Sequence, residues 1–276
     1  MENLLVFRNL KIVTGPRKDP KVLVDIEALA IQKGEILALV GETGSGKTLT
    51  ALSTLRLYPS RRIRTVEGSI DFGGTDLLGC DKKRLNALRG KEIAMIFQDP
   101  MSSLNPVYKV GTVITEIIRT HFALSKTQAR ERAEAAFEYA GLSPAGELLE
   151  RYPHQLSGGQ RQRVCIAMAV SCEPKLLIAD EPTTSLDVTI QAQILRLIER
   201  LKRDKGLSIL FITHNLGIVS QIADRLAVMR KGKIVETGVA AAVLREPQHP
   251  YTRMLLDAIP GINEQRNRLP VIDYTI

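Results

Sequence analysis

EILALVGETGSGKTLTALSTLRLY occupies residues 35–58, and three local patterns follow one another within it. The apolar run 35–41 ends in a glycine and predicts a buried strand. GETGSGKT (41–48) matches the pattern G-x-x-x-x-G-K-[ST], and the segment 48–58 predicts a helix. A strand, a glycine-rich loop and a helix in this order are typical of an α/β fold whose loop wraps a phosphate group, and this context disfavours a chance glycine-rich turn.

The residue types of this loop suit a nucleotide phosphate. Glycines let backbone N–H groups turn inward around phosphate oxygens, and the positive end of the next helix faces the same anion. Lys47 supplies a charge for the β- and γ-phosphates, and the Thr48 hydroxyl is a ligand for Mg²⁺. The predicted nucleotide-binding residues of the loop are Gly41, Glu42, Thr43, Gly44, Ser45, Gly46, Lys47 and Thr48.

A second strand-like run, LLIAD (176–180), ends in a carboxylate. Asp180 is positioned to hold Mg²⁺, and the adjacent Glu181 is a candidate for orienting or deprotonating an attacking water. An apolar run ending in Asp-Glu also has a purely structural interpretation. Its combination with the phosphate loop favours the catalytic one.

Two further strand-like runs end in a polar side chain. His214 ends LSILFITH (207–214), and Gln98 ends KEIAMIFQ (91–98). Ligands bind at the carboxyl ends of strands in α/β sheets, so both residues are candidates for contacting the bound nucleotide, and together with the other motifs His214 is a candidate for sensing the γ-phosphate. Taken singly, each residue also has a structural interpretation, a satisfied histidine or a solvent-facing amide.

A second glycine-rich loop lies far downstream, in HQLSGGQRQRV (154–164). A serine and two glycines precede a predicted helix, which again builds an anion-binding turn. One nucleotide does not need two such loops from the same chain. The alternative interpretation is a simple helix cap.

Composition bounds the class of protein. The chain has 276 residues, 44% of them hydrophobic and 25% charged, so it can bury a sizeable aliphatic core. The net charge of +8 invites a nucleic-acid or membrane-surface interpretation, but the basic residues are dispersed and not interleaved with aromatics. The three cysteines lack metal-type spacing, and no signal peptide or uncharged membrane-spanning run is present.

Short apolar strands alternate with helices along the chain, which predicts a mainly parallel sheet. Residues 3–13 and 22–31 predict two N-terminal strands, and 66–77 and 224–238 predict hairpins. The segment 99–167 shows helical spacing and predicts a helical insert.

These motifs resemble the ATP-binding subunits of ABC transporters over nearly the whole chain. The Walker A loop (41–48), Gln98, the signature LSGGQ (156–160), Walker B (176–181), SLD (185–187) and His214 occur in the family's order. The resemblance implies a P-loop NTPase core of the ABC type, with an N-terminal antiparallel β subdomain and a helical subdomain. It implies an ATPase that uses ATP and Mg²⁺, with Glu181, His214 and Lys47 as catalytic residues and Thr48, Gln98 and Asp180 around the metal.

The resemblance also explains the second loop. ABC ATPases pair head to tail, and the signature loop of one chain closes over the ATP of the other. On this basis the signature residues Ser157, Gly158, Gly159 and Gln160 face the partner's ATP, with Ser157 and Gly159 contacting its γ-phosphate. Ser185, Leu186 and Asp187 form the D-loop at the interface. ATP binding then closes the dimer, and hydrolysis reopens it.

Finer features resemble the oligopeptide/dipeptide/nickel importer group. These are FQDPMSSLNPVYKVG after the Gln98 strand, ADEPTTSLDVTIQAQIL (179–195) and HPYTRMLLDAIPG (249–261). The group implies an ABC ATPase domain over 1–245, a C-terminal extension over 246–276, and contact of segment 98–110 with membrane subunits. It implies a second ATPase subunit (a paralogue or a second copy), two permeases and an extracytoplasmic solute-binding protein, no nucleic acid, and a peripheral location on the cytoplasmic face of the inner membrane.

Three positions depart from the family pattern. Thr14 stands where an adenine-stacking aromatic is often found, and Phe7 is too early to replace it. Asn215 follows His214 where Asp is common. No cysteine follows Cys172, so no iron–sulfur cluster is expected. The missing aromatic and the missing cysteines point toward nickel, but the sequence leaves the solute open between dipeptides, oligopeptides and nickel.

Two other functions stay as alternatives, a soluble ABC ATPase acting on nucleic acid or ribosomes and the ATPase of an exporter. The first usually has two ATPase halves or long coiled-coil inserts, which this chain lacks. The second is usually fused to a membrane domain. The choice between a homodimer and a heterodimer is open, as is the order of the tail 262–276.

Overall fold

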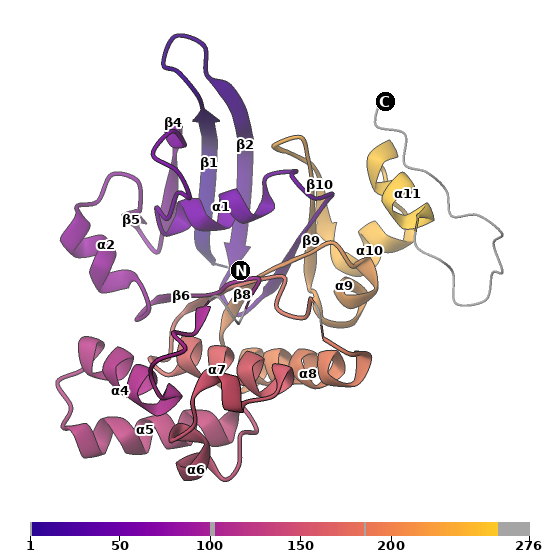
Figure 1. Ribbon diagram of the computed structural model, residues 1–276. Coiled ribbons are helices and arrows are strands. Elements are labelled where there is room, and N and C mark those ends of the chain that lie inside the picture. The colour runs from indigo at the N-terminus through magenta and orange to yellow at the C-terminus, as the bar shows by residue number, and fades with distance from the viewer. Residues whose placement is uncertain (1, 100–102, 185, 259–276) are drawn as a thin grey trace. The chain divides into compact units, whose positions relative to one another are not determined.

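The computed structural model describes residues 2–99, 103–184 and 186–258. They form two compact units, each treated separately below. Of the described residues, the helical unit comprises 2–4, 32–34, 79–99, 103–184 and 186–210, and the phosphate-loop unit comprises 5–31, 35–78 and 211–258. Figure 1 shows the elements of both units.

The helical unit is built mainly from the middle of the chain. Its elements are α2 (Lys82–Leu88), β6 (Ile93–Ile96), α4 (Val110–His121), α5 (Lys126–Tyr139), α6 (Ala145–Leu149), the short 3-10 helix η1 (Pro153–Gln155), α7 (Gly158–Val170), β7 (Leu176–Asp180) and α8 (Val188–Lys205). Strands β6 and β7 pair in parallel, with Ile93 opposite Leu176. Helices α4, α5, α6 and α7 pack on one another (Figure 1).

The helix ends follow the local sequence. Ser125 begins α5 and Ser157 begins α7, each in a capping box with the glutamine three residues later. Gly206 ends α8 in the left-handed conformation, with φ of 62°, as a glycine at a helix C-terminus commonly does. Strand β7 is buried along its whole length, as expected for a parallel strand with both faces covered.

The phosphate-loop unit carries most strands. Its elements are β1 (Asn3–Thr14), β2 (Lys21–Gln32), β3 (Ile36–Val40), α1 (Lys47–Thr54), β4 (Arg64–Phe72), β5 (Thr75–Asp76), α9 (Leu216–Ile222), β9 (Arg225–Arg230), β10 (Lys233–Val239), α10 (Ala240–Arg245) and α11 (Pro250–Asp257). Strand β8 (Ser208–Thr213) begins in the helical unit and ends in this one.

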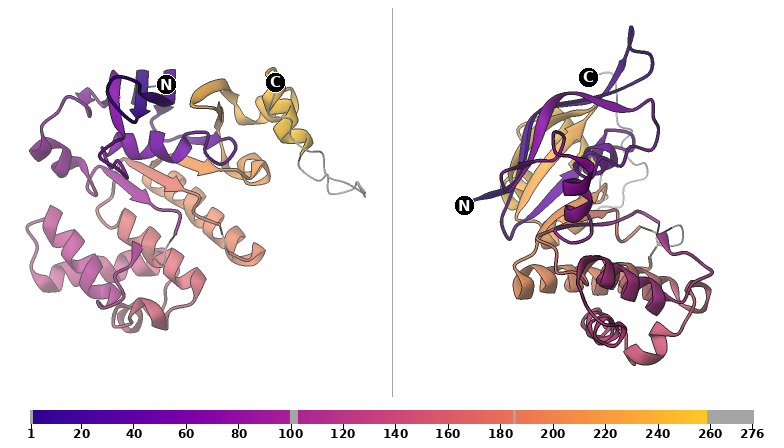
Figure 2. Two further views of the ribbon diagram at one scale, coloured as in Figure 1. Left: turned by 45° about the horizontal axis from the view of Figure 1, so that its top comes forward. Right: turned by 90° about the vertical axis from the view of Figure 1, so that its left-hand side faces the viewer.

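Two sheets contribute to the phosphate-loop unit. One is a four-stranded sheet of order β2-β1-β4-β5, in which β4 pairs antiparallel with both β1 and β5. In the other, β3 and β9 pair in parallel and β9 and β10 form an antiparallel hairpin. The predicted N-terminal antiparallel strands and the closing hairpin are therefore present. Figures 1 and 2 both show α10 and α11 beside the β9–β10 hairpin.

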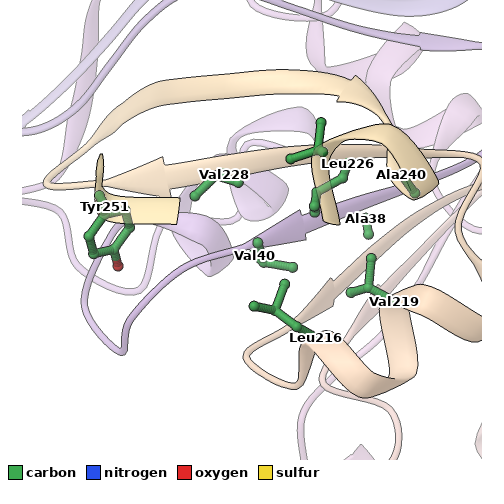
Figure 3. Packing of buried hydrophobic residues seen from close by; sticks show 9 residues of the cluster. Ala38, Val40, Leu216, Val219, Leu226, Val228, Ala240 and Tyr251 are labelled. Atoms are coloured by element: carbon green, nitrogen blue, oxygen red, sulfur yellow. The ribbon is translucent and has the colours of Figure 1, made fainter. Parts of the chain in front are cut away.

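A cluster of apolar side chains from β3, β9 and the C-terminal helices forms a core in this unit (Figure 3). It joins residues of β3 and β9 to residues of the three C-terminal helices, namely Ala38, Val40, Leu216, Val219, Leu226, Val228, Ala240, Val243 and Tyr251. The C-terminal helices are thus part of the core of this unit rather than an appendage.

Some predicted boundaries shift. The predicted helix 48–58 ends at Thr54, because Arg56 takes a φ of 50° that a helix cannot continue. The predicted strand 91–98 contains regular strand only over Ile93–Ile96, so Gln98 lies beyond its end. None of the helices in the described part of the chain combines the length and the apolar composition needed to cross a membrane.

Candidate functional site

The phosphate loop turns tightly between β3 and α1. Gly41 has a φ of 154°, and a Cβ built there would lie 2.1 Å from the Met229 carbonyl oxygen of β9. Gly46, at the start of α1, has a φ of 110°, and its Cβ would lie 2.8 Å from the Met229 methyl carbon. Glycine is therefore required at both ends of the loop, by backbone conformation and by close packing.

Lys47 is buried in the middle of this loop, with 5% of its surface exposed. Its Nζ donates to the Gly41 and Glu42 carbonyl oxygens, each at 2.8 Å. A buried ammonium needs such partners, since burying an unpaired charge is costly. The loop therefore keeps the lysine charge at its centre, where the sequence predicts a phosphate contact.

The back of the loop is held by two residues that sequence reasoning did not assign to the site. The Gly232 N–H, from the β9–β10 turn, donates to the Ser45 carbonyl oxygen at 2.8 Å. The Glu42 N–H donates to the Tyr251 hydroxyl of α11 at 3.1 Å. In the sequence, the HPY stretch around Tyr251 indicates the transporter group but not a contact with the phosphate loop.

The other predicted residues of this unit lie at element ends. Thr48 is exposed in the first turn of α1. His214 is exposed and directly follows β8. Asn215, which departs from the family pattern, begins α9, where its Oδ1 accepts the Gly217 N–H at 2.9 Å. The substitution of Asn for Asp thus keeps a side chain that can cap the helix.

The helical unit brings Gln98 and Glu181 together. Asp180 ends β7 and is only 2% exposed, whereas Glu181 leaves the strand with a φ of 47°. The Glu181 Oε2 accepts hydrogen bonds from Gln98 Nε2 and from Thr184 Oγ1, both at 3.0 Å. The carboxylate is therefore oriented by two neutral donors. Thr184, which lies three residues after Glu181, was not predicted as part of the site.

The second glycine-rich loop is a capped helix start. The Ser157 hydroxyl accepts the Gln160 N–H at 3.2 Å, and Gln160 Oε1 accepts the Ser157 N–H at 3.0 Å. Ser157 and Gly158 are exposed. A Cβ at Gly158 would meet nothing within 4 Å, whereas one at Gly159 would lie 2.9 Å from Ile190 Cγ2 of α8.

The predicted D-loop precedes α8. Asp187 begins this helix, and its Oδ1 accepts the Ile190 N–H at 2.9 Å. Leu186 is half-buried, and its N–H donates to the Thr183 carbonyl oxygen at 3.4 Å. Ser185 lies outside the described residues.

The surroundings of Cys165 and Cys172, in and directly after α7, disfavour the charged thiolate form. Burial, with a smaller effect of the Asp99 charge, raises the pKa of Cys165 to about 12. Burial also raises the pKa of Cys172. Within the described residues, no group of three or more His, Cys, Asp or Glu side chains is arranged to hold a metal ion.

A family model described as ABC transporter matches residues 25–184, which span the phosphate loop, Gln98, the second glycine-rich loop and Glu181. The chain belongs to the ABC transporter family. A second model, described as the C-terminal region of oligopeptide/dipeptide transporters, matches residues 235–274. As a member of the ABC transporter family, the chain binds ATP and couples its hydrolysis to transport.

Several curated relatives in the ABC transporter family are similar over most of their length. The oligopeptide transport ATP-binding protein AppD of Bacillus subtilis is 47% identical over 100% of this chain and 84% of its own. The probable D,D-dipeptide transport ATP-binding protein DdpD of Escherichia coli is 46% identical over 90% of this chain and 76% of its own. The dipeptide transport ATP-binding protein DppD of Bacillus subtilis is 43% identical over 100% of this chain and 82% of its own.

Solved structures support the fold. The ATP-binding cassette MJ0796, in a dimeric post-hydrolysis state bound to ADP and Pi, has a TM-score of 0.75 and 24% identity, and covers 86% of this chain and 98% of its own. CbiO1 from Clostridium perfringens, part of the ABC transporter complex cbiONQ, has a TM-score of 0.75 and 26% identity, covering 89% and 92%. The predicted α/β fold of the ABC ATPase type is thereby confirmed.

Proposed function

We propose that this chain is the energy-coupling ATPase subunit of an importer for dipeptides or oligopeptides. The observation that carries the proposal is the pairing of an ABC transporter match over 25–184 with an oligopeptide/dipeptide C-terminal region over 235–274 in one chain. The relatives described above are named for oligopeptides, dipeptides and D,D-dipeptides. We therefore propose that the solute is a peptide. Two departures from the family pattern, Thr14 in place of an aromatic and the lack of cysteines after Cys172, point toward nickel instead.

For the hydrolysis of ATP, we assign each predicted residue one role. The N–H groups of the loop 41–48 surround the phosphates, and Lys47 neutralises charge on the β- and γ-phosphates. Glu181 positions or deprotonates the attacking water, and His214 senses the γ-phosphate. The hydrogen bonds from Gln98 and Thr184 support the role of Glu181, because they orient its carboxylate.

Mg²⁺ is the metal that the available donors suit. The Thr48 hydroxyl, the Gln98 amide oxygen and the Asp180 carboxylate are all hard oxygen ligands, which Mg²⁺ prefers. When bound, Mg²⁺ would neutralise charge on the phosphates. Asp180 is the one carboxylate of this set, and its burial at the end of a strand fits a fixed ligand position.

We propose that the second glycine-rich loop acts on the ATP of a partner subunit. Ser157, Gly158, Gly159 and Gln160 form an exposed or half-exposed helix start, which favours a neighbouring anion. Leu186 and Asp187, with Ser185, form the D-loop at the same interface. ATP binding then closes a head-to-tail dimer of two ATPase subunits, and hydrolysis reopens it.

The segment 98–110 and the residue before it are proposed to contact the membrane subunits. Phe97, Val107 and Tyr108 expose 43%, 70% and 53% of their surfaces, which is high for apolar and aromatic side chains. Exposed apolar side chains of this kind are available for contact with an apolar surface of a partner. Two permeases would bind here, with an extracytoplasmic binding protein delivering the peptide, and the subunit would lie on the cytoplasmic face of the inner membrane.

The division of the chain that we propose has an ABC ATPase domain over 1–245 with a helical subdomain over about 99–167. The C-terminal extension covers 246–276. The matched oligopeptide/dipeptide region begins earlier, at residue 235, within β10.

The test uses cells in which the chromosomal copy carries Glu181→Gln, with Glu199→Gln as the matched control. Both substitutions remove one negative charge without changing side-chain size, but Glu199 is an exposed residue of α8 outside the proposed site. Cells are supplied separately with labelled dipeptide, labelled oligopeptide and labelled nickel. We expect Glu181→Gln alone to abolish uptake of one peptide class, and the purified variant to bind ATP but turn over slowly.

Loss of nickel uptake alone would contradict the peptide assignment. Intact uptake of all three solutes would contradict the importer function for these solutes. Wild-type ATPase activity in Glu181→Gln would contradict the role given to the carboxylate.

A further inference from the structure

The C-terminal segment HPYTR (249–253) is tied to strand β10 at the point where α11 begins. The Gln248 and His249 N–H groups donate to the two carboxylate oxygens of Glu236, at 2.8 and 3.1 Å. His249 Nδ1 accepts the Tyr251 N–H at 3.1 Å and so caps the helix. These bonds set the position and direction of α11 and therefore of the Tyr251 side chain.

The ring of Tyr251 is an integral part of the core. The residue is 1% exposed and belongs to the apolar cluster with Val40 of β3 and Val228 of β9 (Figure 3). The Arg230 guanidinium lies over its ring, 4.8 Å from the centroid. The hydroxyl of a buried tyrosine usually has a hydrogen-bond partner.

The hydroxyl reaches the first turn of the phosphate loop. It accepts the Glu42 N–H at 3.1 Å, while the Glu42 carbonyl oxygen accepts Lys47 Nζ at 2.8 Å. The same carbonyl also accepts the Ser45 N–H at 3.2 Å. Both backbone polar groups of Glu42 are thus engaged, one by the C-terminal helix and one by the phosphate-binding lysine and loop.

We infer that Tyr251 is a positioning residue for the phosphate loop, through which the oligopeptide/dipeptide-type C-terminal region holds the loop in its nucleotide-binding conformation. The inference rests on the proposed ATPase function. The tyrosine itself does not contact ATP or the reacting atoms. It acts by fixing Glu42, whose carbonyl docks Lys47 and whose N–H is turned toward α11.

The expected consequence is a selective effect on nucleotide affinity. A loop that is less firmly held must be ordered when ATP binds, and this ordering costs affinity. Loss of one buried hydrogen bond to a neutral group corresponds to roughly a threefold to tenfold increase in Kd for ATP. The turnover number should change less than KM, because the hydroxyl does not act on the transition state.

The test compares Tyr251→Phe with Tyr139→Phe in the full-length chain. Tyr139 is the matched control, because its hydroxyl also makes one hydrogen bond, to Asp204 at 3.1 Å, but in α5 of the helical unit. Kd for ATP is measured by titration calorimetry, KM and kcat by phosphate release, and thermal unfolding without nucleotide by differential scanning fluorimetry. We expect only Tyr251→Phe to raise Kd and KM, while both variants change the unfolding temperature by similar small amounts.

A Tyr251→Phe variant with the Kd and KM of wild type would overturn the inference, as would an equal loss of affinity in Tyr139→Phe. If either result is found while the wild-type chain binds and hydrolyses ATP, the inference fails but the proposed function is unaffected. A wild-type chain that does not bind ATP would overturn the proposed function and, with it, this inference. If Tyr251→Phe does not fold, hydrogen exchange of the wild type decides, since a Glu42 amide that exchanges as fast as an exposed one would contradict the bond to Tyr251.

Discussion

The two glycine-rich loops of this chain precede helices in different ways. The helix after the first loop, α1, begins at Gly46 with no side chain capping it, and the loop is held from behind by Gly232 and Tyr251. The helix after the second loop, α7, begins at Ser157 with a complete capping box. The first loop is thus shaped by tertiary contacts, whereas the second is shaped by its own sequence. This difference suits the roles proposed for the two loops, of which the first encloses the chain's own nucleotide and the second is presented to a partner.

The largest expected effect is the loss of ATPase activity on removing the lysine charge, which the first loop has and the second loop lacks. Lys47→Ala removes the buried ammonium at the centre of the first loop, and we expect ATPase activity to fall by roughly a hundredfold or more. The second loop has no lysine within 157–160, so its contribution rests on backbone and neutral groups. Phosphate release by the purified chain is the measurement, with exposed Lys126→Ala in α5 as the control. Activity within twofold of wild type would show that the first loop does not serve the hydrolysed nucleotide.

A smaller effect is expected from the glycines of the second loop. Gly159→Ala places a methyl group 2.9 Å from Ile190 Cγ2, and we expect the free energy of unfolding to fall by about 1–3 kcal/mol through overpacking. Gly158→Ala is the matched control, because its Cβ meets nothing within 4 Å and alanine favours the helix. Chemical denaturation of both variants measures the difference. Equal stability of the two variants would contradict the close approach of α7 and α8.

Substitution of Ser157, which begins α7, tests whether this serine acts only as a helix cap or also binds ATP. Ser157→Ala and Ser125→Ala each remove a capping box, and we expect each to lower stability by about 1 kcal/mol. Only Ser157→Ala should also lower ATPase activity, because Ser125 begins α5 and has no proposed role in the site. Paired denaturation and phosphate-release measurements test this. If both variants keep full activity, the Ser157 hydroxyl acts only as a cap.

The smallest expected effect concerns Glu236, which holds the start of α11 and thereby the position of Tyr251 behind the first loop. Partial burial alone would raise the pKa of Glu236, but hydrogen bonds from the backbone N–H groups of Gln248 and His249 hold it below its ordinary value of 4.5. A carboxylate with a lowered pKa stabilises the fold above its unfolded pKa, and this contribution is lost as the pH falls through the folded pKa.

We therefore expect Glu236→Gln to be less stable than wild type at neutral pH and the difference to shrink below about pH 4.5. Thermal unfolding across this pH range measures it, with exposed Glu138→Gln in α5 as the control. A stability difference that is independent of pH would contradict the ionised anchor.

Much of the site could be predicted from the sequence, because its chemistry lies in short contiguous motifs. The strand–loop–helix around 41–48 follows from apolar patterning and glycine spacing, and so do the polar residues that follow β7 and β8. Local patterns predict element ends less well, as at Arg56, where the backbone leaves the helix earlier than the apolar pattern does.

The sequence by itself determined the α/β class, the phosphate loop, the position of Asp180 and the capped second loop, because each depends on neighbouring residues and backbone preferences. The tertiary structure alone decided which side chains hold these motifs in place. The bond from Gln98 to Glu181 joins residues 83 positions apart, and the bond from Glu42 to Tyr251 joins residues 209 positions apart. Such contacts depend on how strands and helices pack, and no spacing rule along the chain encodes them.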